Sequence, residues 1–346
     1  MSSRRQQAHN LKGEVIFRRK LALQHTTGER VLPDYLGKDE HDRILAERVQ
    51  TTVATFQTLR EKGVDFSSFL ELGAERGHRS LALVNAFSAK GFAADISLDQ
   101  LRTATYFSHQ FNLPLLPARV CCDANQLPFR RGTIPFVFAY QFLHHFPALD
   151  VVMAEIYRVM SRGTFFFDEE PMGRMLQWHL YQQGKKEYSR FNLRKGKFIR
   201  WLEGFISEAC SDEVEHGVIE NHAMPMEHWR DNLQRFDDFD VMVRTLRHLK
   251  SRMTRENRLA NLPNRLLGGV IYGLCHKRNA ISGIQGDPVS WLCCPSCRLA
   301  GMEDAGLVRS GDKMVCAFRE CSYPIVDDIP ILIEPELRRQ LYPEFG

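Results

Sequence analysis

The stretch Phe69–His78, which reads F-L-E-L-G-A-E-R-G-H, constrains the fold of this chain more than any other feature. An apolar, strand-like run leads into a turn with glycines at positions 73 and 77, and a helix-like run follows. Glycine lets the backbone turn tightly and approach a ligand closely. A second strand-like run ends at Asp95, about twenty residues on, where a nucleotide-binding βαβ unit places the acid that binds a ribose. The stretch therefore predicts a nucleotide site.

Two nucleotide templates compete for this loop. A dinucleotide fingerprint, G-x-G-x-x-G, would need glycine at the positions of Glu75 and His78. The template for S-adenosylmethionine (SAM), acid-x-G-x-G-x-G, places its acid at Glu71 and fits three of its four positions, with Glu75 as the exception. A pyrophosphate disfavours nearby carboxylates, whereas the sulfonium and ammonium groups of SAM tolerate them. The residues favour SAM, and an ordinary strand-turn-helix without a ligand is the alternative.

The segments that follow extend the pattern in a definite order. They are V-C-C-D-A at 120–124, L-P-F at 127–129, a strand-like run at 136–140, Q-F-L-H-H-F at 141–146 and a strand-like run at 163–167. This order resembles the class I SAM-dependent methyltransferases, in the broad group with a D-A-x-x-L-P-F and an L-H-H-F segment. The resemblance covers about residues 65–171. It implies an α/β fold, a Rossmann-like seven-stranded class I methyltransferase sheet with a helical lid insert.

The same resemblance implies a set of residues around SAM. The loop is shaped by Glu71, Gly73, Ala74, Glu75 and Gly77; Asp95 takes the ribose hydroxyls and Ile96 flanks the adenine; Asp123 and Ala124 face the adenine amino group; Gln141 lies against the methionine end. Glu75 departs from the glycine pattern. Either it points at the SAM ammonium or pairs with Arg76, or it turns outward and caps the following helix, where an acid is favourable.

Candidate catalytic residues are His144, His145 and Glu170, which follow predicted strands on the ligand side. Methyl transfer needs an aligned nucleophile, and a base only where that nucleophile arrives protonated. Glu170 is the favoured residue for touching substrate, and the histidines alternatively cap or pack a helix. The fourth strand ends A-Y-Q-F rather than N-P-P-Y, which favours O- or N-methylation of a small metabolite over methylation of RNA bases or glutamine.

Two close cysteine pairs near the C-terminus predict a metal site. Cys294 and Cys297 form the first pair, and Cys316 and Cys321 form the second. Four thiolates complete the closed tetrahedron of a structural Zn²⁺ site, whereas catalytic zinc keeps an open position. Cys293 is then a spare buried thiol. A metal-free ribbon held by its own small core is the alternative.

The segment Y-P-I-V-D-D-I-P-I-L at 323–332 completes this C-terminal pattern. Together with C-P-x-C and the second cysteine pair, it is similar to the zinc-ribbon activator of tRNA, rRNA and release-factor methyltransferases, over nearly all of residues 291–335. The resemblance implies a small α+β zinc-ribbon domain that contacts the methyltransferase domain by strand addition, here within one chain.

These patterns give a domain organisation. We expect an N-terminal lead-in and cap helix at 1–62, a methyltransferase domain at 63–280 with a helical insert at about 172–222, a linker at 281–290, and the zinc ribbon at 291–346. No apolar run approaches the ~18 residues of a membrane span. Nine cysteines without a secretory signal suggest reduced thiols, so we expect a cytoplasmic protein without a membrane partner.

The charge is unevenly distributed along the chain. The net charge is +4, and the residues from Trp291 onward carry six Lys/Arg against nine Asp/Glu, so the first 290 residues carry +7. Much of this excess lies within residues 174–200, which reads as an anion-binding surface or as a solvated helical face. The resulting hypothesis is a SAM-dependent methyltransferase of a small anionic metabolite. An RNA or protein methyltransferase with its activator fused in cis, and a non-catalytic SAM-binding scaffold, are the alternatives.

Overall fold

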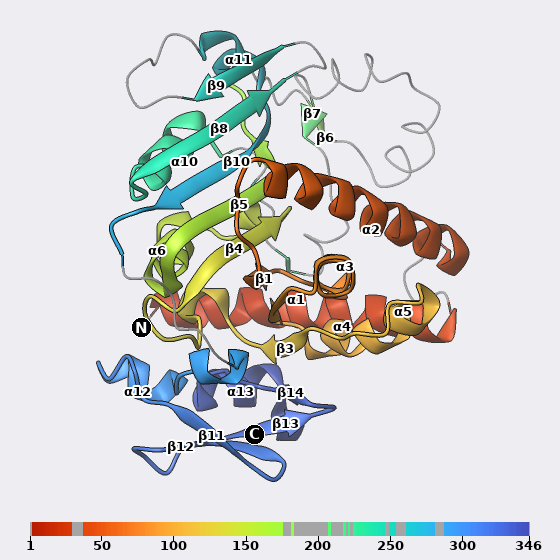
Figure 1. Ribbon diagram of the computed structural model, residues 1–346, viewed down its shortest axis with the longest axis vertical. Helices are drawn as coiled ribbons and strands as arrows, with labels where there is room; N and C mark the ends of the chain where they lie inside the picture. The colour runs from red at the N-terminus through yellow and green to blue at the C-terminus, as the bar shows by residue number, and fades with distance from the viewer. Residues whose placement is uncertain are drawn as a thin grey trace.

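The computed structural model describes residues 2–29, 37–175, 181–182, 207–208, 217–218, 221, 224–245, 249–253, 261–280 and 287–345. These residues form a central sheet with helices on both faces and a C-terminal module (residues 291–345) at one end of the molecule (Figure 1). None of the helices within the described ranges is long and apolar enough to cross a bilayer.

The central sheet has eight strands among the described residues, in the order β3-β2-β1-β4-β5-β10-β8-β9. The strands are β1 (Ser68–Leu72), β2 (Lys90–Asp95), β3 (Ala118–Cys121), β4 (Ile134–Tyr140), β5 (Met160–Met172), β8 (Asp238–Arg244), β9 (Lys250–Met253) and β10 (Gly269–Lys277). The first five in spatial order run parallel, and β10 runs antiparallel to both of its neighbours. This is a Rossmann-like, mostly parallel α/β sheet, as the sequence predicts.

The sheet contains one strand more than the seven expected. β9 pairs antiparallel with β8 at the edge, with Val241 opposite Met253. Its four residues read K-S-R-M, and only Met253 is buried, so no apolar run marks the strand in the sequence. Most of the predicted helical insert at about 172–222 lies outside the described residues. Its described residues include the short parallel pair of strands β6 (Tyr181–Gln182) and β7 (Ser207–Glu208).

Alternating side chains of the strands bury both faces of the sheet. Leu70, Val137 and Phe165 pack with one group of helices, and Phe69 and Phe138 pack with another, as the period of two in a strand requires. The helices of the domain are α3 (His78–Phe87), α4 (Leu98–Arg102), α5 (Ala104–Gln110), α6 (Leu149–Val159), α10 (Met226–Leu233) and α11 (Leu262–Leu267). α6 and α10 cover the first face, and α3 covers the second.

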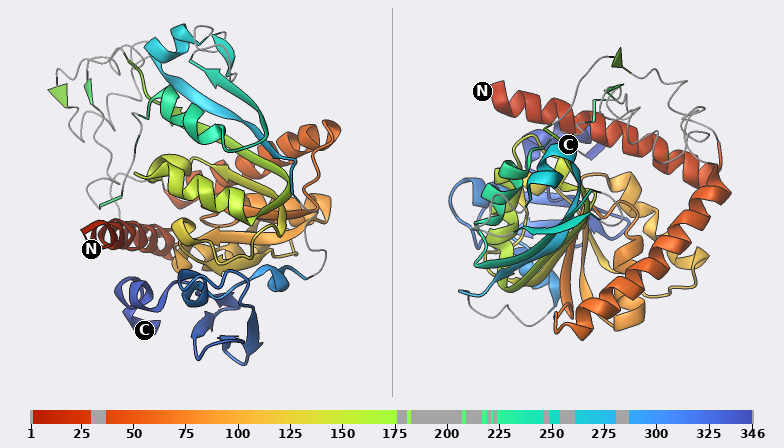
Figure 2. Two further views of the ribbon diagram at one scale, coloured as in Figure 1. Left: turned by 90° about the vertical axis from the view of Figure 1, so that its left-hand side faces the viewer. Right: turned by 90° about the horizontal axis from the view of Figure 1, so that it is seen from above.

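Two N-terminal helices border the sheet. α1 (Ser2–Thr27) and α2 (Lys38–Glu61) lie at an angle to each other on two sides of it (Figure 2). α2 contains the predicted cap helix and buries Leu45, Phe56 and Leu59. The sequence does not predict α1 as a separate helix, because its apolar positions are interrupted by many charged residues.

The C-terminal module is a second, antiparallel sheet with two short helices. Its strands, in the order β11-β12-β13-β14, are β11 (Leu307–Ser310), β12 (Lys313–Cys316), β13 (Ser322–Val326) and β14 (Ile329–Pro330), and its helices are α12 (Pro295–Leu299) and α13 (Pro335–Leu341). The segment after β14 meets the free edge of β3: Ile331 bridges Cys121, and the Leu332 N–H donates to the Cys121 carbonyl at 2.8 Å.

A buried ion-pair network also fastens the module to the sheet domain. The Glu155 carboxylate, on α6, accepts hydrogen bonds from the Leu127 N–H at 2.9 Å and from the Arg158 Nε at 3.0 Å. It also binds the guanidinium of Arg298 from the C-terminal module. Three cationic or N–H donors from separate segments thus converge on one carboxylate.

We expect Glu155→Gln to lower the free energy of unfolding by about 3 kcal/mol, because it leaves two buried guanidinium groups without their carboxylate. The matched control is Glu303→Gln, which breaks the exposed pair with Arg131 at 2.7 Å between the same two parts of the chain. That control should cost less than about 1 kcal/mol. Urea unfolding of both variants measures the difference, and equal losses would contradict the assignment.

Candidate functional site

A cavity of about 1050 Å³ opens where β1, β2, β3 and β4 end. Its floor is formed by residues directly after those strands, and ligands of open parallel sheets bind at this edge. The N-terminal helices and the C-terminal module complete the wall. All three parts of the chain therefore surround one space.

Seven of the ten residues expected at SAM line this cavity. They are Gly73, Glu75, Asp95, Ile96, Asp123, Ala124 and Gln141. The other three, Glu71, Ala74 and Gly77, lie behind the lining among the described residues and shape the loop from within. The fold thus brings the candidate cofactor residues together. Their spacing in the sequence does not reveal which of them line the cavity and which support the loop from behind.

The turn after β1 requires its glycines for two different reasons. Gly73 has φ +64°, and a Cβ there would lie 2.3 Å from Phe142 Cδ2, so both conformation and space exclude a side chain. Gly77 has φ +66° but leaves ordinary room for a Cβ, so only its left-handed conformation favours glycine. Between them the Ala74 N–H donates to the Ala94 carbonyl at 3.0 Å, which ties the turn to β2.

Glu71 supports the turn from the protein interior. Its carboxylate accepts hydrogen bonds from the Ser80 N–H at 3.0 Å and the Ser80 Oγ at 2.5 Å, and so joins β1 to the first turn of α3. Burial raises the pKa of Glu71 to about 7, although Arg79 and Ser80 oppose the shift. The acid of the motif therefore acts here on the protein rather than on a ligand.

Asp95 lies at the centre of the cavity floor. Its carboxylate accepts the Glu75 N–H and the Ser97 N–H, each at 2.8 Å and each on a different oxygen. Every carboxylate oxygen has two lone pairs, so both oxygens keep capacity for further donors such as ribose hydroxyls. Burial raises the pKa of Asp95 to about 6, against the effect of the two N–H groups.

Glu75, the exception in the motif, points neither outward nor into a helix cap. Its carboxylate pairs with Arg18 of α1 at 2.5 Å and with Arg76 at 3.4 Å. Burial alone would raise the pKa of Glu75, but the two guanidinium groups outweigh burial and hold the pKa below its ordinary value. One expected alternative, pairing with Arg76, is observed, together with an unexpected partner from the N-terminal helix.

The remaining cofactor candidates are held by local contacts. Asp123 Oδ1 accepts the Asn125 N–H at 2.9 Å and thereby shapes the short 3₁₀ turn Ala124–Gln126. Gln141 has φ +47°, and its Nε2 donates to Glu169 Oε2 at 3.0 Å. Both residues follow a strand end. Gln141 has a rarely adopted backbone conformation and Asp123 begins a tight turn, and such backbone is common at ligand sites.

Glu170 does not line the cavity, which differs from the expectation that it touches substrate. Its side chain is 0 % exposed and accepts the N–H groups of Phe142, Leu143 and His144 at 2.7, 2.9 and 3.2 Å. It also bonds the His144 ring at Nδ1, 2.9 Å away. With these donors both oxygens are occupied, so Glu170 organises the loop after β4 while His144 and His145 face the cavity.

The rest of the cavity wall carries cationic and imidazole groups from α1, α2, the turn after β1 and α3, which are not among the residues predicted to contact SAM. Arg18, Arg48, Arg76 and Arg79 line it, together with His25 and His41. The two imidazoles stack at 3.6 Å between ring centroids, and Arg76 contacts His25 Nδ1 at 2.9 Å. Burial and then Arg76 lower the pKa of His25 to about 3 and that of His41 to about 2, so both rings are neutral at physiological pH.

Arg48 differs from Arg18 and Arg76, which are in ion pairs, and from Arg79, which contacts the His78 ring at 3.1 Å and lies over the ring of Tyr140. Arg18 is paired with Glu14 and Glu75, and Arg76 with Glu75. Within the described part of the chain, the Arg48 guanidinium makes no hydrogen bond or ion pair, although its residue is half-buried. Among the described residues, this end of the cavity therefore presents a guanidinium without an ion pair, which acts on the Glu75 carboxylate only electrostatically.

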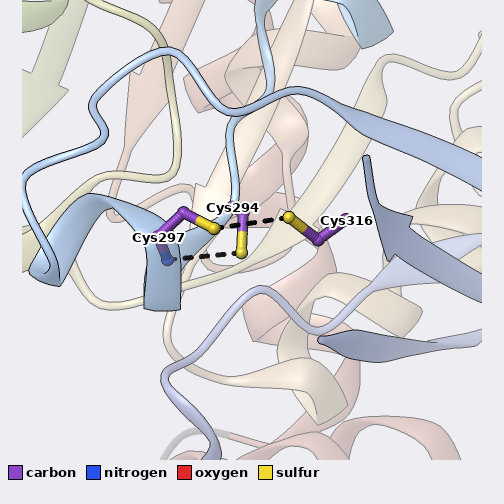
Figure 3. Close-up of side chains that lie close together, drawn as sticks. All are labelled: Cys294, Cys297 and Cys316. Atoms are coloured by element: carbon purple, nitrogen blue, oxygen red, sulfur yellow. Dashed lines mark hydrogen bonds between the residues drawn. The ribbon is translucent and has the colours of Figure 1, made fainter. Parts of the chain in front are cut away.

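The cysteine cluster of the C-terminal module contains three of the four predicted thiols. The Sγ atoms of Cys294, Cys297 and Cys316 all lie within 4.8 Å of one another, and all three residues are buried. They point toward one another from the start of α12 and the end of β12 (Figure 3). Zn–S bonds of about 2.3 Å place tetrahedral sulfurs about 3.8 Å apart, so the spacing fits zinc.

Cys321 is not part of this cluster. Its carbonyl accepts the Cys316 N–H at 2.9 Å, and its side chain is only half-buried. The hydroxyl of Tyr323 instead approaches Cys294 Sγ at 3.3 Å. Cys293, the predicted spare, is buried apart from the cluster, and burial raises the pKa of its thiol to about 11.

Comparison with known proteins supports a methyltransferase. A family model described as a methyltransferase domain matches residues 70–167, which run from β1 to β5. No curated protein matches the chain. The family match and the Rossmann-like strand order together support a SAM-dependent methyltransferase.

Three solved structures illustrate the similarity of this chain to known folds. One is a SAM-dependent methyltransferase from Methanococcus maripaludis described as hypothetical in function (14% identity, 70% of this chain and 90% of that chain, TM-score 0.41). Another is a methyltransferase of similar status from Bacillus halodurans (14%, 66% and 99%, TM-score 0.40). A third belongs to a complex of the Haloferax volcanii Trm112 methyltransferase activator with a methyltransferase (13%, 62% and 84%, TM-score 0.36). At these scores the neighbours add no argument about this chain.

The raised pKa of Asp95, about 6, predicts pH-dependent cofactor affinity. Ribose hydroxyls donate to the ionised carboxylate, so below the pKa a bound proton must first be released. We expect the dissociation constant of S-adenosylhomocysteine (SAH) to increase about tenfold from about pH 7.5 to about pH 5. Titration calorimetry measures the profile, Asp95→Asn should flatten it, and a pH-independent wild-type affinity would contradict the role of Asp95.

Proposed function

We propose that this protein transfers a methyl group from SAM to an oxygen or nitrogen of a small anionic metabolite held in the cavity at the strand ends. The observation that carries the proposal is that the candidate cofactor residues line the same cavity as the Arg48 guanidinium, which has no ion-pair partner among the described residues. A cavity of about 1050 Å³ lies at the upper end of the range for small-molecule sites, and so has room for a cofactor beside a small acceptor.

The cofactor side of the proposal rests on the cavity floor. Asp95 would accept the ribose hydroxyls, with Ile96 beside the adenine and Asp123 near its amino group. SAM supplies an activated methyl group on a sulfonium. The protein's task is then to align the acceptor and exclude water, which the surrounding helices α1, α2 and α13 serve.

The acceptor side rests on charge. Arg18 and Arg76 pair with Glu14 and Glu75, whereas the charge of Arg48 has no ion-pair partner among the described residues. One carboxylate or phosphate group would neutralise it with charge-assisted hydrogen bonds. A cavity with so few cations that lack an ion pair fits a small anion better than a nucleic acid, whose binding needs a continuous basic surface.

His144 is the proposed general base for an acceptor that arrives protonated. Its Nδ1 lies 2.9 Å from the buried Glu170 carboxylate, which accepts the Nδ1–H and thus selects the tautomer whose Nε2 is the acceptor nitrogen. The ring lines the cavity. Glu170 is then a positioning residue, and His144 is the group that would take the proton.

The test of this function has two stages. SAH binding by calorimetry examines the cofactor site, and absence of binding at millimolar SAH would exclude catalysis by this chain. Transfer of a radiolabelled methyl group from SAM is then screened over carboxylated and phosphorylated metabolites. His144→Gln should keep SAH affinity within about twofold while turnover of an acceptor falls about a hundredfold. Equal turnover in the variant would remove the base role.

The charge of Arg48 gives a sharper prediction about the acceptor. Arg48→Gln should change the affinities for SAH and for 5′-methylthioadenosine by less than about threefold, while acceptor binding is lost. The matched control is Arg43→Gln, an exposed residue of the same helix that pairs with Glu47. Weaker SAH binding with unchanged methylthioadenosine binding would instead assign Arg48 to the carboxylate of SAM, and the anionic acceptor would lose its support.

The thiol cluster is proposed as a structural zinc site held by Cys294, Cys297 and Cys316, within a zinc-ribbon module at residues 291–346 fused to the methyltransferase domain. Backbone N–H groups of Cys297 and Phe318 approach Cys294 Sγ and Cys316 Sγ, each at 3.4 Å, which stabilises thiolates. Cys321, the second cysteine of the second pair, is proposed as the fourth ligand, which requires that the turn after Cys316 rearrange to bring its thiol to the cluster.

Elemental analysis of the purified protein is expected to find about one zinc per chain. Cys297→Ser should lose the metal and lower the melting temperature, because structural zinc contributes directly to folding. Cys122→Ser, at a buried thiol outside the cluster, serves as the control and should retain the metal. Retention of zinc by both variants would contradict the site.

A further inference from the structure

We propose that Tyr342, the residue that follows α13 in the C-terminal module, is a positioning residue of the cofactor site. This rests on the proposed function, because it assigns a role within the same cavity. Tyr342 is 0 % exposed and reaches across to the loop that follows β2. Its hydroxyl donates to the Ile96 carbonyl at 2.6 Å and accepts the Leu98 N–H at 2.9 Å.

This pair of hydrogen bonds holds the loop on both sides of Ser97. Ile96 lines the cavity where the adenine is expected, and Leu98 begins α4. Asp95 fixes the other end of the loop through the Ser97 N–H at 2.8 Å. The shape of the adenosine-facing loop is therefore set from the ligand side by Asp95 and from behind by a residue of another module.

A second segment expected at adenosine is also fastened by the module. The turn after β3, which carries Asp123 and Ala124, continues into Gln126, whose Nε2 donates to the Pro295 carbonyl at 3.0 Å. Two residues on, the Pro128 carbonyl accepts the Cys293 N–H at 2.9 Å. Both segments expected to face adenosine are thus hydrogen-bonded to the C-terminal module.

The module also reaches the cavity itself. Glu334, Leu337 and Gln340 of the α13 region line it beside Ile96. Arg19 of α1 pairs with Glu344 at 2.7 Å, so the module additionally fixes the helix that covers the cavity. The ligand site is therefore incomplete without residues 334–342.

Loss of the Tyr342 hydroxyl has a predictable consequence. It leaves the buried Leu98 N–H without its acceptor and removes a donor from the Ile96 carbonyl, which favours loop conformations other than the one shown. Apparent affinity falls in proportion to the population of the binding-competent loop. All ligands that share the adenosine group should lose affinity by the same factor, because the change lies behind adenosine and not at the methionine end.

The experiment compares Tyr342→Phe with Tyr272→Phe, which removes a phenol hydroxyl from β10 in another part of the sheet. Calorimetry with SAH and with 5′-methylthioadenosine is expected to show both ligands about five- to thirtyfold weaker in Tyr342→Phe and unchanged in Tyr272→Phe. Hydrogen exchange should rise in residues 96–102 while residues 291–300 stay protected, which separates loop release from unfolding of the module.

A second variant tests the C-terminal module at the cavity independently, in case Tyr342→Phe fails to fold. Leu337→Ala removes a half-buried side chain that lines the cavity from α13, and should weaken SAH about three- to tenfold without altering the loop. Wild-type binding together with unchanged SAH affinity in Tyr342→Phe would overturn the inference, whatever the result for Leu337→Ala. Absence of SAH binding in the wild type would instead overturn the proposed function, so the two failures are distinguishable.

Discussion

The carboxylate of Asp95 is the interaction on which the rest of the site depends. It joins the loop after β1, through the Glu75 N–H, to the loop after β2, through the Ser97 N–H. Glu75 in turn carries the ion pair to Arg18 on α1, and the loop that contains Ser97 carries the two hydrogen bonds of Tyr342. The N-terminal helix, the sheet and the C-terminal module are thus ordered about one acidic group at a strand end.

The features that the sequence predicts well are those encoded locally. The glycines of Phe69–His78 adopt the left-handed conformations for which glycine is suited, and Asp95 falls where a βαβ unit returns its second strand. The parallel strands are continuous apolar runs, which are visible in any reading of hydrophobicity. By contrast β9 and α1 carry charges along most of their length, so their tertiary contacts, not their own patterns, decide their structure.

Side-chain direction is not specified by a motif. Glu169 and Glu170 are adjacent near the end of β5, where Glu169 has φ +61° and the pairing with β10 shifts register. Glu169 is exposed there and Glu170 is buried. Counting by twos does not separate the two carboxylates in the sequence, because Phe165, Phe166 and Phe167 are all buried and both faces of β5 are apolar. The case of Cys321 differs, because the spacing of the two cysteines says nothing about how the turn after Cys316 orients the second thiol, which lies outside the cluster.

Glu75 shows how a departure from a motif can be explained by a distant segment. A non-glycine residue at φ +47° costs about 1–2 kcal/mol, which the glycine usual at this position would avoid. Its N–H nevertheless bonds Asp95, and its carboxylate is held by Arg18 and Arg76 in a largely buried setting, where charge-assisted bonds are strong. The strain of Glu75 is therefore offset by α1. The pair of Glu75 with Arg18 thus links the altered loop to the N-terminal helix, and Arg76 and Glu14 extend it into a network of four charged side chains.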